Sequence, residues 1–213
     1  MIIPQAERLK DILYSSKRWD GKEFSGAEAD LLSNYYELVL KWNNRLHLTT
    51  LTQPREFFGR HILESAFSES FILPVVNQVW DLGSGLGVPG IVIAVLRPNL
   101  AVRLVEVGRN RAIFLQEAVE ILGLNNVEVV ESRFEAVEMF PEKSCLAARA
   151  IESMENLIPE ILKLGTSASQ ILIFGSEKLG EKARELLNDQ QQMECLLIPG
   201  SDRRYLMNIF RST

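Results

Sequence analysis

The sequence predicts an α/β protein in which a doubly wound sheet follows a helical extension. From residue 78 onward, short apolar runs typical of strands alternate with segments of helical periodicity, which is the pattern of a parallel sheet covered by helices on both faces. A cluster of glycines directly follows the first of these strands. Before residue 78 the periodicity is helical throughout. We therefore expect residues 1–75 to form the extension and residues 76–213 to form one compact domain.

The extension contains two recognisable helix starts. Ser25-Gly26-Ala27-Glu28 is a capping box, in which the serine and the glutamate satisfy each other's backbone N–H groups. The helix that follows carries an apolar stripe formed by Leu31, Leu32, Tyr35, Leu38, Val39 and Trp42. A second helix should begin near Pro54, because proline suits the first turn of a helix, and it should end before Pro74.

The domain should contain seven strands. The first five are expected at residues 79–82, 102–106, 127–130, 144–148 and 170–174, with intervening helices at 89–96, up to Leu122, at 154–164 and at 177–188. The last two strands, 193–198 and 205–210, are joined by Pro199-Gly200-Ser201-Asp202. Because this connection is short and rich in turn residues, we expect the closing pair to be antiparallel.

The composition excludes several classes of protein. Hydrophobic residues make up 46% of the chain and charged residues 24%, which is typical of a globular protein. No apolar run is long enough to span a membrane, and Met1-Ile2-Ile3-Pro4 lacks the basic start of a secretory signal, so we expect a cytoplasmic protein. The two cysteines form no disulfide framework, and the spacing of potential ligands predicts no metal site. Nothing in the sequence implies an oligomer.

The net charge of −5 counts against binding of bare nucleic acid by bulk attraction. A nucleic-acid substrate would therefore require a local basic patch, or a folded target that is partly coated by protein.

The glycine cluster after the first strand has two interpretations. Asp81-x-Gly83-x-Gly85-x-Gly87 is the form typical of S-adenosylmethionine-dependent methyltransferases, whereas Gly85-x-Gly87-x-x-Gly90 is the form typical of nicotinamide-dinucleotide oxidoreductases. In both cases glycines let the main chain approach a ligand, and the following helix start offers free N–H groups. Glu106 fits both, because an acidic residue at the end of the second strand binds ribose hydroxyls.

Three features favour S-adenosylmethionine. Asp81 precedes the glycines, where its carboxylate could meet the amino group of a methionine moiety directly or through water. Pro89 has no N–H to offer a pyrophosphate. The antiparallel closing pair also departs from the symmetric dinucleotide-binding plan. The oxidoreductase interpretation stays open, as does a tight turn that binds no ligand.

Several blocks of sequence carry a more specific resemblance, dense from about Leu38 to Ile151 and thinner afterwards. In chain order they are Trp42-Asn43, Leu48-Thr49, Arg60-His61-Ile62-Leu63-Glu64-Ser65, Asp81-Leu82-Gly83-Ser84-Gly85-Leu86-Gly87-Val88-Pro89-Gly90-Ile91, Arg111-x-x-Phe114-Leu115, Leu122-Gly123-Leu124-x-Asn126-Val127 and Ala148-Arg149-Ala150. Together they resemble the RsmG (GidB) family, which methylates N7 of a guanine in 16S rRNA. The resemblance implies the seven-stranded class I S-adenosylmethionine-dependent methyltransferase fold, and 16S rRNA or small ribosomal subunit particles as partners.

The resemblance also assigns roles to residues. It implies cofactor contacts at Gly83, Val88, Phe134, Glu135 and Arg149, which join Asp81, Gly85, Gly87 and Glu106 from the glycine turn. Independently of the resemblance, the side chains expected around the ligand crevice give the expected RNA contacts, which are Arg60, His61, Arg111, Arg203 and Arg204. Several of these residues have alternative interpretations. Phe134 and His61 could be core residues, Arg149 could pair with Glu152 or Glu155, and the arginines could be scattered surface charge.

The chemistry of the expected acceptor asks for little acid–base catalysis. N7 of guanine carries an unprotonated lone pair, so transfer depends on alignment, and the sequence assigns no certain catalytic residue; Arg149 is the nearest candidate. One departure from the family is notable, since Phe174-Gly175 stands where a lysine–glycine pair is usual. It is the only support for a further alternative, a family member that binds cofactor or RNA without turnover.

Overall fold

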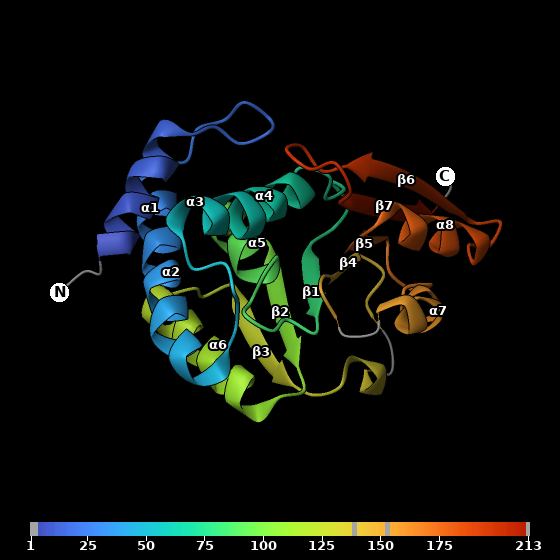
Figure 1. Cartoon of the computed structure of the whole chain (residues 1–213). Coiled ribbons are helices and arrows are strands. Elements are labelled where there is room, and N and C mark those ends of the chain that lie inside the picture. The colour runs from blue at the N-terminus through green and yellow to red at the C-terminus, as the bar shows by residue number, and fades with distance from the viewer. Residues whose placement is uncertain (1–3, 138–139, 152–153, 212–213) are drawn as a thin grey trace.

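The computed structural model describes residues 4–137, 140–151 and 154–211. Its centre is a seven-stranded sheet with the order β3-β2-β1-β4-β5-β7-β6 (Figure 1). The strands are β1 (Gln78–Leu82), β2 (Ala101–Glu106), β3 (Val127–Glu131), β4 (Ser144–Ala148), β5 (Gln170–Gly175), β6 (Gln191–Leu197) and β7 (Tyr205–Arg211). The first five are parallel, and β7 pairs antiparallel with both β5 and β6. The predicted antiparallel closing pair is confirmed.

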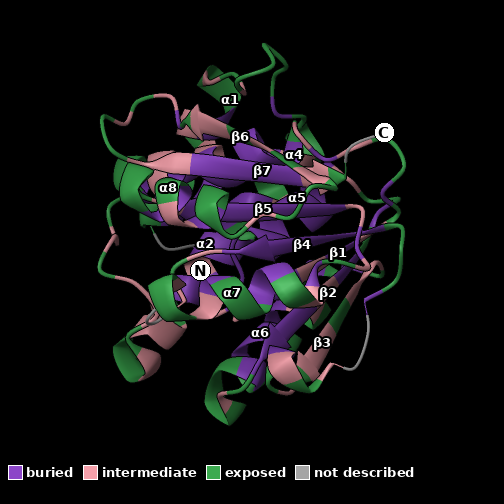
Figure 2. Cartoon of the chain, turned by 90° about the vertical axis from the view of Figure 1, so that its right-hand side faces the viewer, coloured by how far each residue is buried: buried purple, intermediate pink, exposed green. Residues whose placement is uncertain are grey.

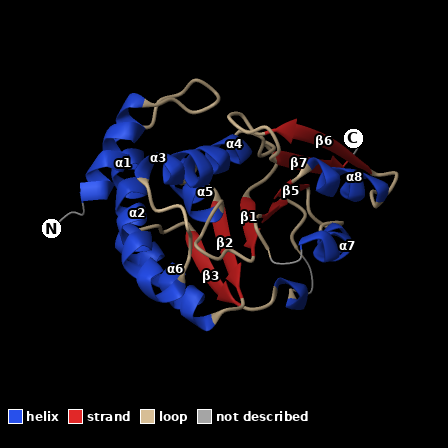
Figure 3. Cartoon of the chain, viewed as in Figure 1, coloured by secondary structure: helices blue, strands red, loops and turns tan. Residues whose placement is uncertain are grey.

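Helices flank the sheet on both sides (Figure 3). Before β1 they are α1 (Pro4–Ser15), α2 (Gly26–Leu46), α3 (Pro54–Phe57), the π-helix η1 (Phe58–Leu63) and α4 (Glu64–Glu69). Between the strands come α5 (Gly90–Leu96), α6 (Arg109–Leu122), the short 3-10 helix η2 (Phe134–Ala136), α7 (Met154–Leu164) and α8 (Glu177–Glu185). In Figure 1, α2 and α6 lie on one side of the sheet, and α7 and α8 lie on the other.

The alternation of side chains along each strand builds two hydrophobic cores. Cys145 and Ala147 of β4 belong to the core shared with α2, α5 and α6, whereas Leu146 and Ala148 belong to the core shared with α7 and α8. Both faces of the central strands are therefore buried, as the burial colours show (Figure 2). This arrangement is expected for a parallel sheet between two helical layers.

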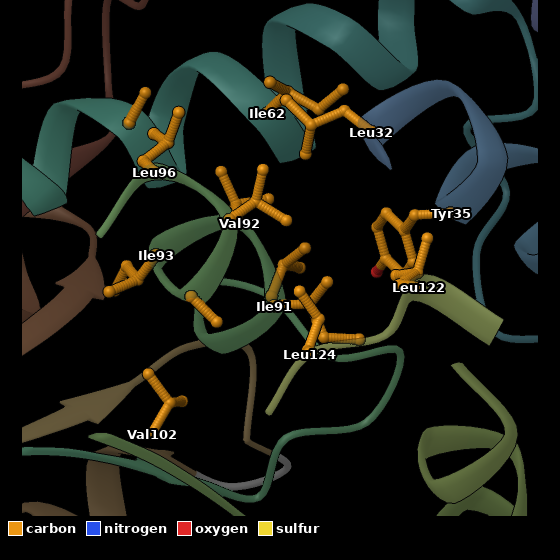
Figure 4. Packing of buried hydrophobic residues seen from close by; sticks show 14 of the residues in the cluster. Leu32, Tyr35, Ile62, Ile91, Val92, Ile93, Leu96, Val102, Leu122 and Leu124 are labelled. Carbon is orange, nitrogen blue, oxygen red and sulfur yellow. The ribbon is translucent and has the colours of Figure 1, made fainter. Parts of the chain in front are cut away.

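The N-terminal helices belong to the first of these cores. Leu32 and Tyr35 of α2 point toward Ile91 and Val92 of α5, with Leu122 at the end of α6 beside them (Figure 4). The capping box predicted at Ser25 is present, with the Ser25 side chain accepting from the Glu28 N–H and the Glu28 carboxylate accepting from the Ser25 N–H. The boundary of the extension at residue 75 remains a prediction.

The structure differs from the expected elements in details. Helix α5 begins at Gly90 and α8 ends at Glu185, and β6 begins at Gln191 because its pairing with β7 extends to Arg211. The helix that begins at Pro54 widens into a π-helix at 58–63, which helical periodicity alone cannot predict. Within the described residues, no helix combines the length and hydropathy needed to cross a bilayer.

A buried polar network ties the segment before β1 to the far half of the sheet. The Gln170 side chain accepts from the Leu73 N–H at 3.0 Å and donates to the Phe71 carbonyl at 2.8 Å. It also donates to Asn208 Oδ1 at 2.7 Å, and Asn208 donates to Glu194 at 3.0 Å. Gln170 is 1% exposed, so no solvent replaces these bonds.

Gln170→Leu should therefore lower the free energy of unfolding by about 2 to 4 kcal/mol, because it leaves several buried polar groups without partners. Urea denaturation measures the loss. The matched control is Gln116→Leu on the exposed face of α6, which should change stability little. Equal effects of the two substitutions would show that the network contributes nothing.

Candidate functional site

The glycine turn lies between β1 and α5, and its three glycines have different surroundings. Gly83, Gly85 and Gly87 all have positive φ, a conformation that favours glycine. A Cβ on Gly87 would lie 2.5 Å from Cδ1 of Ile91, so this glycine is required by packing against α5. A Cβ on Gly85 would meet no atom closer than 3.8 Å, because this residue faces a pocket. A Cβ on Gly83 would lie 3.1 Å from Cγ1 of Ile151, so of the three glycines only Gly85 presents open main chain to the pocket.

Asp81 lies beneath the turn and does not line the pocket. Its Oδ2 accepts a hydrogen bond from the Gly90 N–H at 3.0 Å, and it is 1% exposed. Of the N–H groups that the helix start was expected to offer to a ligand, that of Gly90 is already bonded to this carboxylate. Burial raises the pKa of Asp81 to about 7, although the Gly90 N–H opposes the shift.

Glu106 at the end of β2 joins that strand to the turn. One carboxylate oxygen accepts from the Gly85 N–H at 2.8 Å and the other from the Gly108 N–H at 2.7 Å. The side chain lines the pocket although the residue is only 3% exposed. A carboxylate has about four acceptor positions, so about two remain for ligand hydroxyls.

The opposite wall of the pocket is the segment 47–51 after α2. Asn43 holds it through two hydrogen bonds of 2.9 Å with the main chain of Thr49, and the Thr49 hydroxyl lies 3.0 Å from His61 Nε2. Burial, with help from nearby arginines, lowers the pKa of His61 to about 3. The imidazole is therefore neutral near pH 7, and His61 is both a buried residue and part of the pocket wall.

Tyr35 of α2 connects the N-terminal helices to the turn. Its hydroxyl donates to the Leu86 carbonyl at 2.6 Å, and its side chain is fully buried. Burial raises the pKa of this phenol, so it remains a donor. Sequence reasoning placed Tyr35 only in an apolar stripe, because its contact with Leu86 joins residues 51 positions apart.

The pocket above the turn, here called the turn pocket, has a volume of about 620 Å³. The predicted residues Gly83, Gly85, Val88, Glu106, Arg60, His61, Arg111 and Arg149 line it. A neighbouring pocket of about 400 Å³ shares Gly83, Val107 and Ile151 with it and is lined by Phe134 and Glu135. Phe134 is 6% exposed and belongs to the second core, and its contact with a cofactor remains a prediction.

A third pocket, of about 370 Å³, contains the remaining predicted residues, Arg203 and Arg204. Glu64, at the start of α4, also lines it and is 3% exposed. Its carboxylate lies 2.7 Å from Arg204 Nε, 3.0 Å from Arg149 Nη2 and 3.0 Å from Arg60 Nε. We call these four residues the arginine cluster.

The arginine cluster shows the surroundings of three predicted site residues, Arg149, Arg203 and Arg204. Arg149 pairs with Glu64 and also donates to the Arg60 carbonyl at 2.6 Å, whereas no ion pair with Glu155 forms and Glu152 lies outside the described residues. Arg203 and Arg204 both line this pocket, but the Arg203 side chain is 86% exposed and lies 3.8 Å from Asp202, whereas Arg204 lies 2.7 Å from Glu64. Glu64 itself was not predicted as a site residue, although it stands in the block that begins at Arg60.

Backbone strain concentrates around the turn pocket. The only non-glycine residues with positive φ among those described are His47 and Ala150, and both line this pocket. Such conformations cluster at functional sites. No group of three or more histidine, cysteine or acidic side chains that could hold a metal occurs in the described part of the chain.

Tyr35→Phe should lower the free energy of unfolding by about 1 kcal/mol and speed hydrogen exchange at the Gly87 amide, because the Leu86 carbonyl loses its anchor. The matched control is Tyr36→Phe, which removes a hydroxyl that donates to the Thr52 carbonyl instead. The Tyr36→Phe variant should lose a similar free energy of unfolding, and hydrogen exchange at its Gly87 amide should be unchanged. Identical exchange in the two variants would contradict a role for Tyr35 in holding the turn.

Asp81→Asn should change the pH dependence of stability. Because the pKa of Asp81 rises from 3.8 to about 7 on folding, the folded chain binds more protons in this window, and stability falls as pH rises through it. Asparagine does not titrate, so the variant does not lose stability in this way. The free energy of unfolding of the variant relative to wild type should therefore rise by up to about 4 kcal/mol between about pH 4 and about pH 8. Urea denaturation across this range, with exposed Asp189→Asn as control, measures the difference; parallel curves would refute it.

Solved structures of methyltransferases share this fold. The METTL16 methyltransferase domain superposes with a TM-score of 0.57 at 12% identity, covering 99% of this chain and 93% of that one. The ribosomal protein L11 methylase of Lactobacillus delbrueckii subsp. bulgaricus gives a TM-score of 0.56 at 16% identity, covering 71% and 78%. The predicted fold, a seven-stranded class I methyltransferase sheet, is confirmed.

Similar sequences carry the name ribosomal RNA small subunit methyltransferase G. The one from Pseudomonas entomophila is 31% identical over 99% of this chain and 98% of its own length. The one from Xanthomonas campestris pv. campestris is 37% identical over 65% of this chain, and the alignment spans 66% of that relative. The family model described as GidB, rRNA small subunit methyltransferase G, matches residues 28–199. The chain therefore belongs to the GidB family, as its sequence blocks predicted.

Proposed function

We propose that this chain uses S-adenosylmethionine to methylate N7 of a guanine in 16S rRNA. The observation that carries the proposal is the family match over residues 28–199, which includes both the glycine turn and the arginine cluster residues Arg60, Glu64 and Arg149. Membership of a methyltransferase family decides against the oxidoreductase interpretation of the turn. The absence of a free first N–H at α5 supports the same choice, since a pyrophosphate would need it.

The residues of the two adjoining pockets fit the parts of the cofactor. Gly85 leaves room for its amino-acid end along the turn, Gly83 lines the same pocket, and the remaining acceptor positions of Glu106 suit ribose hydroxyls. Phe134 and Glu135 line the neighbouring pocket, which suits the adenine. Asp81 is assigned a positioning role through Gly90, since its carboxylate lies beneath the turn.

The bound cofactor would supply an electrophilic methyl group on a sulfonium, and this chain's residues would align the acceptor with it. The guanine N7 has a lone pair, so no proton need be removed. The site agrees with such an acceptor, because His61 is held neutral and hydrogen-bonded and the Glu106 carboxylate already accepts from two N–H groups. Positioning and exclusion of water are the tasks left to the protein.

The substrate proposal also has to accommodate a net charge of −5. Arg60, Arg149 and Arg204 gather around one carboxylate, and Arg111 lines the adjoining turn pocket. This is the local basic patch that an acidic protein needs for binding RNA. We propose 16S rRNA or a small ribosomal subunit particle as the partner and the cytoplasm as the place of action.

A second candidate function is binding of cofactor or RNA without turnover. It is favoured by Phe174, which stands where the resemblance implies a lysine. Phe174 is 7% exposed, and its ring lies 5.3 Å from the Arg149 guanidinium carbon. An apolar ring therefore occupies this position beside the arginine cluster.

Radiolabelled methyl transfer tests the proposal most directly. The purified protein should label 16S rRNA, bare or in small subunit particles from cells that lack this protein, and the label should map to a guanine N7. Binding of S-adenosylhomocysteine, measured by calorimetry, separates the outcomes. Binding without transfer to any RNA would favour the second candidate function, and absence of both would refute the proposed function.

Glu106→Ala should weaken S-adenosylhomocysteine binding by about tenfold or more, because it removes the ribose acceptor and releases the Gly85 N–H. Glu131→Ala is the matched control, since Glu131 pairs in register with Glu106 at the end of the neighbouring strand and is exposed. The affinity of the Glu131→Ala variant for S-adenosylhomocysteine should match that of wild type. Equal affinities of the two variants would contradict the role of Glu106.

A further inference from the structure

The third pocket is separate from the turn pocket and contains no residue of the glycine turn. The two pockets share Arg60, Arg149 and Ala150, so one strand end forms a wall between them. On its other sides, the third pocket is lined by Phe174 of β5 and by Arg204 at the start of β7. It therefore lies beside the proposed cofactor site, toward the antiparallel half of the sheet.

The charges in this pocket do not balance. Glu64 contributes one negative charge, and Arg60, Arg149 and Arg204 contribute three positive charges within 3.0 Å of its carboxylate. The three arginines come from η1, from the end of β4 and from the start of β7. Two positive charges are thus in excess at a site that is partly withdrawn from water, which is costly without a counter-charge.

The arginines also have unused donors. The Arg149 side chain is 8% exposed, and its Nη1 is buried without a hydrogen-bond acceptor among the described residues. Arg60 Nε lies 3.0 Å from the Glu64 carboxylate but makes no hydrogen bond among the described residues, and the Arg60 side chain is 41% exposed. Each guanidinium carries five N–H donors in a rigid fork that matches the oxygens of a phosphate.

We infer that the third pocket binds a phosphate group of the RNA backbone close to the guanine that is methylated. Glu64 is the positioning residue, because its carboxylate accepts hydrogen bonds from Arg149 Nη2 and Arg204 Nε and lies 3.0 Å from Arg60 Nε. Phe174 supports the Arg149 guanidinium from its ring face. This inference rests on the proposed function for the identity of the RNA, whereas anion binding in the pocket does not depend on it.

A carboxylate could satisfy the same arginines, and the amino-acid end of the cofactor carries one. Arg60 and Arg149 line both pockets, so they are open to either source. Arg204 lines only the third pocket and Glu64 lies beside it, which favours the RNA phosphate. The experiment must separate the two anions.

Arg204→Gln is the main variant, and Arg204→Lys retains the positive charge but lacks the planar set of guanidinium N–H donors. Glu64 is left intact, since its removal would leave buried cations unpaired and could prevent folding. Arg184→Gln is the control for net charge, because Arg184 is an exposed residue of α8 that lines none of the three pockets. All variants should bind S-adenosylhomocysteine like wild type, which verifies their folding.

Inorganic phosphate is the first probe, added to protein with isotope-labelled arginine side chains. Millimolar phosphate should shift the Nε–H resonances of Arg60 and Arg204 in a saturable manner, with and without saturating S-adenosylhomocysteine. Arg204→Gln should weaken phosphate binding, Arg204→Lys should restore part of it, and Arg184→Gln should leave it unchanged. If S-adenosylhomocysteine abolished the shifts, the anion would be the cofactor carboxylate and the inference would be overturned.

Affinity for small ribosomal subunit particles is the second readout. Arg204→Gln should weaken it about tenfold and reduce the slope of log affinity against log salt by about one, as expected for one lost phosphate contact. The inference would be overturned if Arg184→Gln weakened particle binding as much as Arg204→Gln does. It would also be overturned if phosphate shifted the Nε–H resonance of neither Arg60 nor Arg204. Binding of S-adenosylhomocysteine and methyl transfer are measured separately from both of these readouts. Failure of the phosphate subsite is therefore distinguishable from failure of the proposed function.

Discussion

The site depends on a stretch of main chain that is fixed by side chains from outside it. Glu106 accepts the Gly85 N–H, Asp81 accepts the Gly90 N–H, and Tyr35 donates to the Leu86 carbonyl. These contacts come from β2, β1 and α2, so the turn is tied to the sheet and to the N-terminal helices at once. Two buried carboxylates are required for this arrangement, and the raised pKa of Asp81 is its electrostatic consequence.

A second constraint is the sharing of Glu64 by three arginines. The carboxylate joins the segment before the sheet to the ends of β4 and β7, and it concentrates positive charge at one edge of an acidic protein. Since Arg149 lines both the turn pocket and the third pocket, a proposed cofactor site and a proposed RNA site share a wall. Proximity of the two reactants follows from this shared residue.

Local patterns predicted the fold because strand periodicity, the capping box at Ser25 and the turn at Pro199 are properties of neighbouring residues. Long-range contacts could not be predicted in this way. The Glu64–Arg204 pair joins residues 140 positions apart, and only the folded chain separates Arg204 from exposed Arg203.

The central claim is that the glycine turn and Glu106 hold the amino-acid end and the ribose of S-adenosylmethionine. A crystal structure with S-adenosylhomocysteine bound tests it most directly. The account predicts ribose hydroxyls on the Glu106 carboxylate, the homocysteine along Gly83 and Gly85, and the adenine beside Phe134. A ligand bound elsewhere, or a turn pocket that stays empty at saturating ligand, would contradict it.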